Sequence, residues 1–534
     1  MTQHRHGPGG LRSGRRPRGP RTVAAADFRF ALFLALALAV AACSTPHHGA
    51  AAIRSAATTS TAPGGAGGAG GAGSAAGRGQ SGAAISHSSV SAGQAGSQGQ
   101  SNAAGTQGQS GQGGGHGQIV VAGKTLVFSH GVSNGEIEIG IPWIDTAAGK
   151  AALASIGGAG ATLGDSKAQA QAVVDYVNSH GGIDGLKVKP VFYQINVPNS
   201  THASGRAQEA QAECAAWEQD HHAFAFLVVL APDDVHLACS QATHTPVISA
   251  AAITSLTVDE VLSSQMRNLI YNPSGLLADQ RERTIVDRMV TTGVMTPKSK
   301  VGVLFDANSA VSRRSAARTL VPELNRRNIR VVSQIGISDC LDAPYGTYVL
   351  QLRQAGVTDV YLSAGNCGAA PVILFGRAAD SQGWYPHIIL GSDEAPGGMP
   401  GTQSEKIVEQ MHGAGWQPHY DVQYTTTKPV SPTDALCGQI MKGAGEPEYD
   451  SFDMATGYCE GLLFLQAALR NSTAITPDGL AAGAEALRNT WPGVLTPHSD
   501  FSGGYHDAAD AIQPFAYDRS CKCMKYVGVA VPSH

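Results

Sequence analysis

A repeated alternation of apolar and amphipathic segments is the feature that most constrains how this chain folds. Ile137, Ile139 and Ile141 occupy every second position, which predicts a strand, and the helical pattern that follows ends at Gly181-Gly182. The first series continues with a strand over 188–195, a helix over 203–218, a strand over 223–230, a helix over 234–243 and a strand over 246–250. Strands that alternate with helices predict a parallel sheet with right-handed crossovers.

The alternation begins again after an extended segment, MRNLIYNPSG, over 266–275. The second series has strands over 300–305, 329–337, 359–365 and 387–393, separated by helices over 312–327, 344–355 and 369–382. Two such series predict an α/β protein with two doubly wound, Rossmann-like lobes. The extended segment is suited to carry the chain from one lobe to the other.

The N-terminus has the pattern of an export signal. Residues 1–29 hold seven arginines and one acid, and the apolar run that follows, about thirteen residues long, is too short to span a bilayer as a helix, which takes roughly 20. Val40-Ala41-Ala42-Cys43 resembles a bacterial lipobox, so we expect a signal peptide over 1–42 and a lipid on Cys43. An ordinary signal peptide followed by a chance cysteine is the alternative. Pro17 after Arg15-Arg16 favours Sec export over the twin-arginine route.

A long segment of low complexity separates the signal from the periodic part. Residues 49 to about 118 are almost wholly Gly, Ala, Ser, Gln and Thr. Such a composition cannot bury enough apolar surface to offset its ordering entropy, which predicts a disordered tether over 43–118. A coil of that length has a reach of roughly 45–50 Å, so the folded part can work away from a membrane surface.

Charge and spacing exclude several function classes. The segment 1–42 holds seven of the 37 basic and one of the 41 acidic residues, so the rest carries a formal charge of −10. No basic stripe favours nucleic acid. No second apolar run reaches membrane-spanning length, and no cysteine or histidine spacing indicates a metal site. We therefore expect no cofactor and no metal.

Nine cysteines agree with a location outside the cytoplasm. Without Cys43 eight remain, an even number that predicts disulfides, although eight cysteines permit 105 connectivities. Order along the chain favours four near-neighbour pairs: Cys214–Cys239, Cys340–Cys367, Cys437–Cys459 and Cys521–Cys523. The last pair is the least secure because its ring is so small.

Several segments, taken in order, resemble one known family. They are EIEIGI, LGDSKAQAQAVVDYVNSHGGIDGLKV, TPVISAAAITS, KVGVLFDAN and YDSFDMATGYCEGLLFLQAAL, and the run NSHGGIDG over 178–185 is similar to the family's N-x-x-G-G-I-x-G turn. Over about 134–530 the chain resembles the branched-chain amino-acid type of periplasmic binding protein, the substrate receptor of ABC importers. The resemblance implies a type I periplasmic-binding fold with a multi-strand hinge, lobe 1 being 119–270 plus 420–495 and lobe 2 being 271–419 plus 496–534.

The expected ligand site lies between the lobes. Open α/β sheets bind ligands beyond the carboxyl ends of their strands, and two facing lobes make a cleft that can close over the ligand. Loops over 143–163, 231–234 and 251–254 in lobe 1, and over 306–309, 365–366 and 392–394 in lobe 2, should face it. The candidate ligand-binding residues are Trp143, Leu163, Asp233, Asp234, Ala251, Ile253, Thr254, Asn308, Asn366, Asp393 and Glu394.

The candidate loops depart from the family's pattern. The family's amino-acid receptors hold the ligand carboxylate with small and hydroxyl residues, where this chain has Asp233, Asp234 and Ile253. Leu163 stands where the family often has an aromatic residue, and Asp393 or Glu394 matches an acid that receives a ligand ammonium. These differences favour a cationic or neutral polar ligand over a plain α-amino acid.

We therefore expect a monomeric, lipid-anchored binding protein on the outer face of the cell membrane that delivers a small polar molecule to an ABC-transporter permease. An enzyme is disfavoured, because the folded part contains no G-x-S-x-G, H-E-x-x-H or P-loop pattern. A tethered sensor or interaction protein with the same fold remains an alternative, which a permease and ATPase encoded alongside would disfavour.

Overall fold

The structure is a computed structural model, and it describes residues 117–121, 124–155, 163–200, 203–228, 234–249, 266, 268–422, 429–446, 454–497, 499–502 and 506–533. The predicted signal peptide, the lipidation site at Cys43 and nearly all of the predicted tether lie outside the described residues. The first described strand, β1 (Gly117–Val121), begins slightly before the predicted end of the tether.

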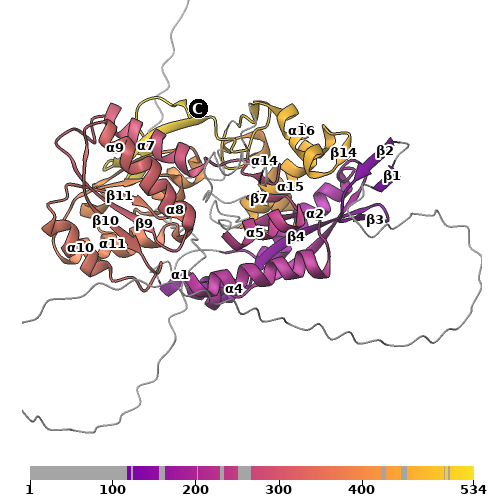
Figure 1. The fold of residues 1–534 in the computed structure, drawn as a ribbon, viewed down its shortest axis with the longest axis horizontal. Helices are drawn as coiled ribbons and strands as arrows, with labels where there is room; N and C mark the ends of the chain where they lie inside the picture. The colour runs from indigo at the N-terminus through magenta and orange to yellow at the C-terminus, as the bar shows by residue number, and fades with distance from the viewer. Residues whose placement is uncertain are drawn as a thin grey trace, which may run out of the picture. The chain divides into compact units, whose positions relative to one another are not determined.

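The first sheet is parallel apart from one short hairpin strand (Figure 1). Its strand order is β5-β4-β6-β7-β8, and β3 pairs with β4 in an antiparallel hairpin. The strands are β3 (Val132–Ser133), β4 (Glu136–Ile144), β5 (Lys187–Ile195), β6 (Ala225–Val228), β7 (Val247–Ser249) and β8 (Ile270–Tyr271). β4 and β5 pair along their whole length, as two adjacent strands joined by a helical crossover should.

Helices from two distant parts of the chain pack on this sheet. The early helices are α1 (Thr146–Ser155), α2 (Ser166–Ser179), α3 (Val197–Ser200), α4 (Ala203–Cys214), which continues as the π-helical segment η1 (Ala215–Asp220), and α5 (Asp234–Thr243). The late helices are α14 (Pro432–Gly443), α15 (Met454–Arg470) and α16 (Pro477–Leu487), and Figure 1 shows them beside α2. The segment that contains α14, α15 and α16 therefore returns to complete lobe 1.

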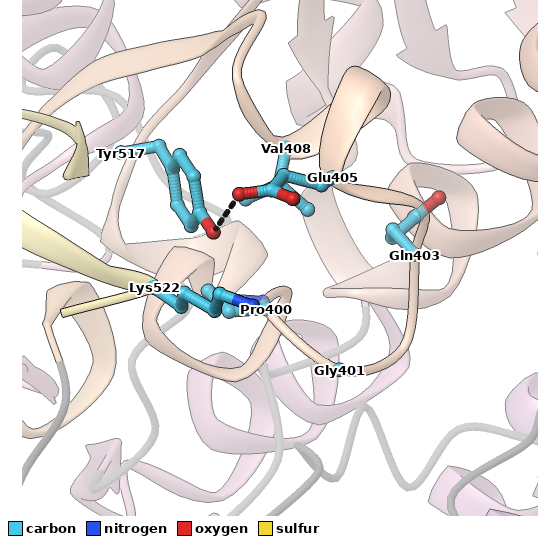
Figure 2. Close-up of a pocket in the computed structure, with 7 residues that line it drawn as sticks. All are labelled: Pro400, Gly401, Gln403, Glu405, Val408, Tyr517 and Lys522. Atoms are coloured by element: carbon cyan, nitrogen blue, oxygen red, sulfur yellow. Dashed lines mark hydrogen bonds between the residues drawn. The ribbon is translucent and has the colours of Figure 1, made fainter. Parts of the chain in front are cut away.

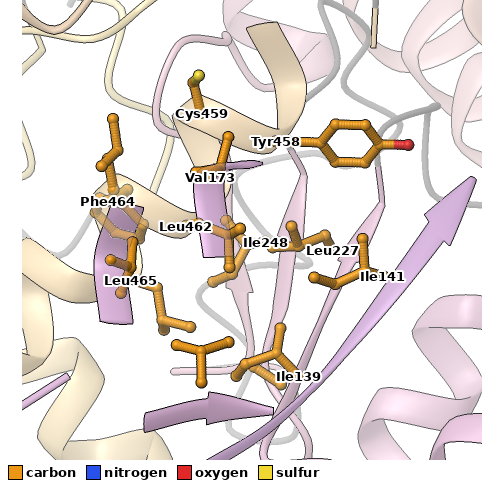
Figure 3. Close-up of a cluster of buried hydrophobic side chains, with 14 of the residues drawn as sticks. Ile139, Ile141, Val173, Leu227, Ile248, Tyr458, Cys459, Leu462, Phe464 and Leu465 are labelled. Atoms are coloured by element: carbon orange, nitrogen blue, oxygen red, sulfur yellow. The ribbon is translucent and has the colours of Figure 1, made fainter. Parts of the chain in front are cut away.

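The core of lobe 1 explains why α15 returns to the sheet. Ile139, Leu227 and Ile248 project from three neighbouring strands toward Leu462 of α15, and all four side chains are fully buried (Figure 3). The Tyr458 hydroxyl is buried there too and donates a 2.7 Å hydrogen bond to the Pro142 carbonyl. Full burial of one such aliphatic side chain stabilises the fold by about 1.5–3 kcal/mol.

A small third sheet flanks lobe 1. The hairpin of β1 and β2 (Lys124–Phe128) is antiparallel, and β14 (Ala474–Ile475) adds to β2 in parallel. The contact between β2 and β14 joins segments about 350 residues apart.

The second sheet has the order β10-β9-β11-β12-β13-β15-β16. Its first five strands are parallel, β15 runs antiparallel to β13, and β17 pairs with β15. The strands are β9 (Lys300–Asp306), β10 (Arg330–Ile337), β11 (Asp359–Ser363), β12 (His387–Leu390), β13 (Met411–Gly415), β15 (Ala511–Asp518), β16 (Cys523–Tyr526) and β17 (Val531–Pro532).

Helices cover the second sheet as well (Figure 1). They are α7 (Ala278–Thr291), α8 (Ala310–Ser315), η2 (Ala316–Leu320), α9 (Val321–Arg326), α10 (Tyr345–Gln354), α11 (Ala370–Ser381), α12 (Glu405–Val408) and α13 (Pro418–Asp421), with single 3-10 turns at η3 (Gly365–Cys367), η4 (Ser392–Glu394) and η5 (Pro396–Gly398). The predicted helix over 312–327 is continuous through α8, η2 and α9, with a π-helical turn in its middle.

A buried carboxylate ties together chain segments that run between the two sheets. Glu460 of α15 is fully buried and accepts hydrogen bonds from the Ser274 hydroxyl (2.7 Å), the Trp491 indole nitrogen (3.1 Å) and the Leu495 amide (3.2 Å). A buried carboxylate needs such donors, because an unpaired buried charge is very costly. These bonds fix the paths of the crossing segments; the exact lobe boundaries stay a prediction.

The eight cysteines in the described part form the four pairs that the sequence favours, namely Cys214–Cys239, Cys340–Cys367, Cys437–Cys459 and Cys521–Cys523. The first three each join two elements: α4 with α5, the residues after β10 with η3, and α14 with α15. The fourth lies within one hairpin.

Helices α1 and α7 are among the elements that the sequence analysis did not predict. The predicted loop over 143–163 contains α1, whose alanines give it high helix propensity and whose first turn is capped by Asp145, which accepts from the Ala148 amide at 2.8 Å. The region before β9 was left without an element, yet α7 occupies it. Its apolar face, Ile285, Val286 and Met289, is narrow among many charges, so the helical pattern is weak in the sequence.

Candidate functional site

The expected ligand site lies where the strands of both parallel sheets end. In lobe 1, β6 and β7 run into residues 229–233 and 250–265, which the structure does not describe. These two ranges contain four of the candidate residues, namely Asp233, Ala251, Ile253 and Thr254. Their role in ligand binding stays a prediction.

Trp143 and Leu163 pack against the helices at the edge of the lobe 1 sheet. The Lys167 ammonium of α2 lies 5.1 Å from the centre of the Trp143 ring, a cation–π distance. The Leu163 side chain is next to Gly149 of α1, where a Cβ atom would come within 3.1 Å of it. Both residues have these protein partners in the structure, and a ligand contact stays a prediction for each.

In lobe 2 the strand ends present a buried acid and two amides. Asp306, the last residue of β9, is fully buried and accepts a 2.9 Å hydrogen bond from the Asn308 amide. The Asn308 side chain is exposed and donates to the Ser338 carbonyl at 2.6 Å. Asn366 lies half-buried in η3, directly after β11. Asn308 and Asn366 therefore follow neighbouring strands, as the sequence analysis expected.

Asp393 and Glu394 are placed differently from expectation, because α7 supplies them with a cation. The Arg281 guanidinium lies 2.7 Å from the Asp393 carboxylate and 2.5 Å from that of Glu394. It also contacts Glu282 at 2.8 Å and donates to the Ser363 hydroxyl at 3.1 Å. All four charged side chains are at most 3% exposed, so both acids have a cation of the protein as partner, and a ligand contact stays a prediction for each.

The charges of this cluster are unbalanced, with three carboxylates around one guanidinium. Burial raises the pKa of Asp393 well above its usual range, although Arg281 opposes the shift, and burial also raises the pKa of Glu394. Burial disfavours charged Arg281, but Glu394, Asp393 and Glu282 outweigh it and raise its pKa. The Glu394 oxygens also accept from the Ala364 and Gly391 amides, so this acid holds the ends of β11 and β12 together.

Two side chains of lobe 1 reach residues of lobe 2. Asp234, the first residue of α5, accepts a 3.3 Å hydrogen bond from the Ala310 amide at the start of α8. Arg206 of α4 lies 3.8 Å from the Asp306 carboxylate and 3.0 Å from the Cys340 sulfur. The first contact joins the starts of α5 and α8, and the second joins α4 to the end of β9 and to the loop after β10. Both lie near strand ends, where the ligand was expected.

Arg206 was not singled out by the sequence analysis. Its side chain is 10% exposed, and its Nε has no hydrogen-bond partner among the described residues. A carboxylate at 3.8 Å and a disulfide sulfur satisfy a guanidinium poorly, because a paired arginine forms donor–acceptor contacts of about 2.7–2.9 Å. A single arginine near the start of a helix carries no sequence pattern that indicates ligand binding. Its burial in the fold is what distinguishes Arg206 from the other arginines of the surface.

Metal and membrane functions find no support in the described part of the chain. Across these ranges no group of three or more His, Cys, Asp or Glu residues is arranged to hold a metal ion. No helix within the described segments is long and apolar enough to cross a membrane.

Two parallel, helix-covered sheets, linked by several crossing segments and completed by the C-terminal chain, define the type I periplasmic-binding fold. Solved structures of ABC-transporter substrate-binding proteins share this fold with the chain at low sequence identity. No protein-family model matches the sequence, and no curated protein matches it.

Three of these structures illustrate the likeness. A branched-chain amino acid ABC transporter protein from Thermus thermophilus with bound valine has a TM-score of 0.54 at 13% identity, covering 74% of this chain and 96% of that one. A fatty acid ABC transporter substrate-binding protein from Thermomonospora curvata has a TM-score of 0.53 at 18% identity, and the match covers 75% of this chain and 94% of that one. A solute binding protein of an ABC transporter from Rhodopseudomonas palustris BisB5, in complex with 3,4-dihydroxy benzoic acid, has a TM-score of 0.52 at 12% identity. The match covers 75% of this chain and 98% of that one.

Proposed function

We propose that this protein is the extracytoplasmic substrate receptor of an ABC importer, anchored through lipid on Cys43. It captures a small polar molecule between its lobes and delivers the molecule to a permease. The observation that carries the proposal is the pair of contacts, from Asp234 to the start of α8 and from Arg206 to the end of β9, that join the two lobes near strand ends on a type I binding fold. Ligands of open α/β sheets bind at such strand ends, and a site built from both lobes can close.

The ligand we propose carries a carboxylate, and an amino acid or related compound fits best. Arg206 offers a nearly buried guanidinium whose partners in the protein are weak. Arginine binds carboxylates through two parallel hydrogen bonds. Asp234, which is exposed, and its neighbour Asp233 would receive an ammonium group. Asp393 and Glu394 are left out of this site because Arg281 binds them.

The relatives support a carboxylate class without fixing the compound. Valine, fatty acids and 3,4-dihydroxybenzoic acid, which are named with the three similar structures, differ in size and polarity but share a carboxyl group. The acids Asp233 and Asp234 favour a zwitterion or a polar acid over a fatty acid in this chain, because an apolar tail gains nothing from a carboxylate.

A thermal-shift screen of the mature protein against amino acids, their amides, polyamines and small carboxylic acids tests the proposal. A ligand at 100 times its dissociation constant adds about 2.7 kcal/mol to stability. Arg206→Gln should weaken a carboxylate ligand by roughly 10- to 150-fold, the value of a charge-assisted hydrogen bond. Arg318→Gln, which alters an exposed arginine of η2, is the matched control.

Two further readouts separate the parts of the proposal. Small-angle X-ray scattering should show a more compact particle with ligand than without, and an unchanged profile would contradict closure. Deletion of the gene should abolish uptake of the identified ligand; normal uptake would favour a sensor. Unaltered affinity in Arg206→Gln would contradict the role of Arg206 and leave the receptor function standing.

A further inference from the structure

The disulfide Cys521–Cys523 stands apart from the other three. Its cysteines are two residues apart, whereas the other pairs are separated by 22 to 27 residues. Both of its cysteines are half-exposed. Each of the other three bridges contains at least one cysteine that is 6% exposed or less. A thiolate in solution can therefore reach this bridge more readily than the rest.

The bridge contributes little to holding the hairpin together. β15 and β16 are already paired from Phe515↔Tyr526 to Asp518↔Cys523 by the antiparallel ladder. In the turn, Asp518 accepts from the Ser520 amide at 2.7 Å, and it forms a 3.1 Å ion pair with Lys525. Since the bridge closes a ring around a single residue, it constrains the unfolded chain far less than a bridge across a long loop does.

The residue inside the ring has an unfavourable backbone conformation. Lys522, the residue between the two cysteines, has a φ of 53°, in the left-handed region that non-glycine residues rarely adopt. Opening the bridge frees this residue to relax. Strained or exposed disulfides have higher reduction potentials than buried structural ones, and they are the ones that take part in exchange.

The surroundings favour a departing thiolate. The Lys522 side chain is exposed, and no carboxylate in the described part of the chain lies within ion-pair distance of it. A nearby cation stabilises a thiolate and lowers the barrier to its release. Lys522 also lines an open cavity of about 350 Å³ together with Tyr517, Glu405 and the turn at Pro400-Gly401, where the Tyr517 hydroxyl donates to Glu405 at 3.2 Å (Figure 2).

We propose that Cys521–Cys523 is a thiol–disulfide exchange site whose substrate is a dithiol. One thiolate of the dithiol attacks one bridge sulfur, the Cys521–Cys523 bond breaks, and the other cysteine leaves as a thiolate beside Lys522. The second thiolate of the dithiol then attacks its own sulfur in the mixed disulfide and releases the second cysteine. Two electrons pass to the protein, which gains two thiols, and the dithiol becomes a disulfide. This site is separate from the proposed ligand site and does not depend on it.

The test is a graded reduction of the full mature protein with dithiothreitol. Thiols are trapped by acid and alkylation, and each cysteine pair is scored by peptide mass spectrometry, with Cys437–Cys459 as the internal control. We expect Cys521–Cys523 to open at a dithiol concentration about tenfold or more below that which opens the control. The thermal unfolding midpoint should not change on opening. Opening together with the control, or unfolding on opening, would overturn the proposal.

A second measurement addresses the role of Lys522. Lys522→Gln should slow the rate of exchange at pH 7 by about three- to tenfold, because the departing thiolate loses its cation. Lys298→Gln, which removes an exposed lysine from another turn of lobe 2, should exchange at the wild-type rate. If Lys522→Gln exchanged at the wild-type rate, the proposed role of Lys522 in stabilising the departing thiolate would be wrong.

Discussion

At the scale of single residues, Arg281 decides what the acids of lobe 2 can do. Asp393 and Glu394 follow a strand end, a position that in the sequence indicates ligand contact. In the fold both carboxylates form ion pairs with Arg281, which lies about 110 residues earlier in the chain. In the same cluster the Ser363 hydroxyl donates a 2.7 Å hydrogen bond to Glu282. Burying a carboxylate is favourable only with such partners. The cluster therefore fixes the ends of β11 and β12.

Arg281→Met should destabilise the protein by about 3–5 kcal/mol at neutral pH, because three buried carboxylates lose their cation. The folded-state pKa values of Asp393 and Glu394 already lie above their unfolded values, so the folded state binds more protons and stability falls as pH rises from about 4. Without Arg281 both pKa values rise further. The loss should therefore be larger at pH 8 than at pH 5, as measured by urea unfolding.

Arg326→Met is the matched control for this prediction. Arg326 is 67% exposed and pairs with Glu323 within one helix, so its removal should cost less than about 1 kcal/mol and show little pH dependence. Equal effects in the two variants would contradict a stabilising role for the buried cluster.

At the scale of elements, α15 is held to the lobe 1 sheet by packing and to α14 by one disulfide. Cys437 of α14 and Cys459 of α15 are both fully buried and closed into a disulfide. Gly461, two residues after Cys459 in α15, lies so close to β6 that a Cβ atom would come within 2.8 Å of Leu227. The helix therefore sits directly on the sheet, and the bridge anchors its neighbour α14.

Replacing Cys437 and Cys459 together by alanine should cost about 3 kcal/mol, the chain-entropy value for a loop of 22 residues. Chemical unfolding of the double variant measures the change. The double alanine variant of Cys521 and Cys523 should lose much less, since its loop is minimal. A larger loss at the second pair than at the first would contradict both the anchoring role and the exchange site.

At the scale of the whole molecule, the proposed receptor depends on an anchor that precedes the described residues. Cys43→Ser should leave the protein either unprocessed or released into the medium, because lipid is attached through the cysteine sulfur. Detergent-phase partitioning and N-terminal mass spectrometry check this. If the variant partitioned into detergent as the wild type does, the lipoprotein hypothesis would be wrong.

The sequence alone was sufficient for features whose cause is local. The isoleucine alternation in β4 and the glycines that end α2 depend on neighbouring residues, and both are present in the structure. Helix α5 has the predicted bounds, and the order of strands and helices was enough to predict two parallel sheets.

Only the tertiary structure decided which partners the charged side chains have. Arg281 reaches Asp393 and Glu394, and Arg206 reaches Asp306, across separations of about 100 residues. No local pattern encodes such pairs, because the free energy of a charge depends on burial and on whichever opposite charge the fold brings near it. The sequence therefore predicted the type I fold and the strand ends that carry the candidate site. The fold itself determined that Arg206 lies beside Asp306 at a strand end and that Arg281 binds Asp393 and Glu394.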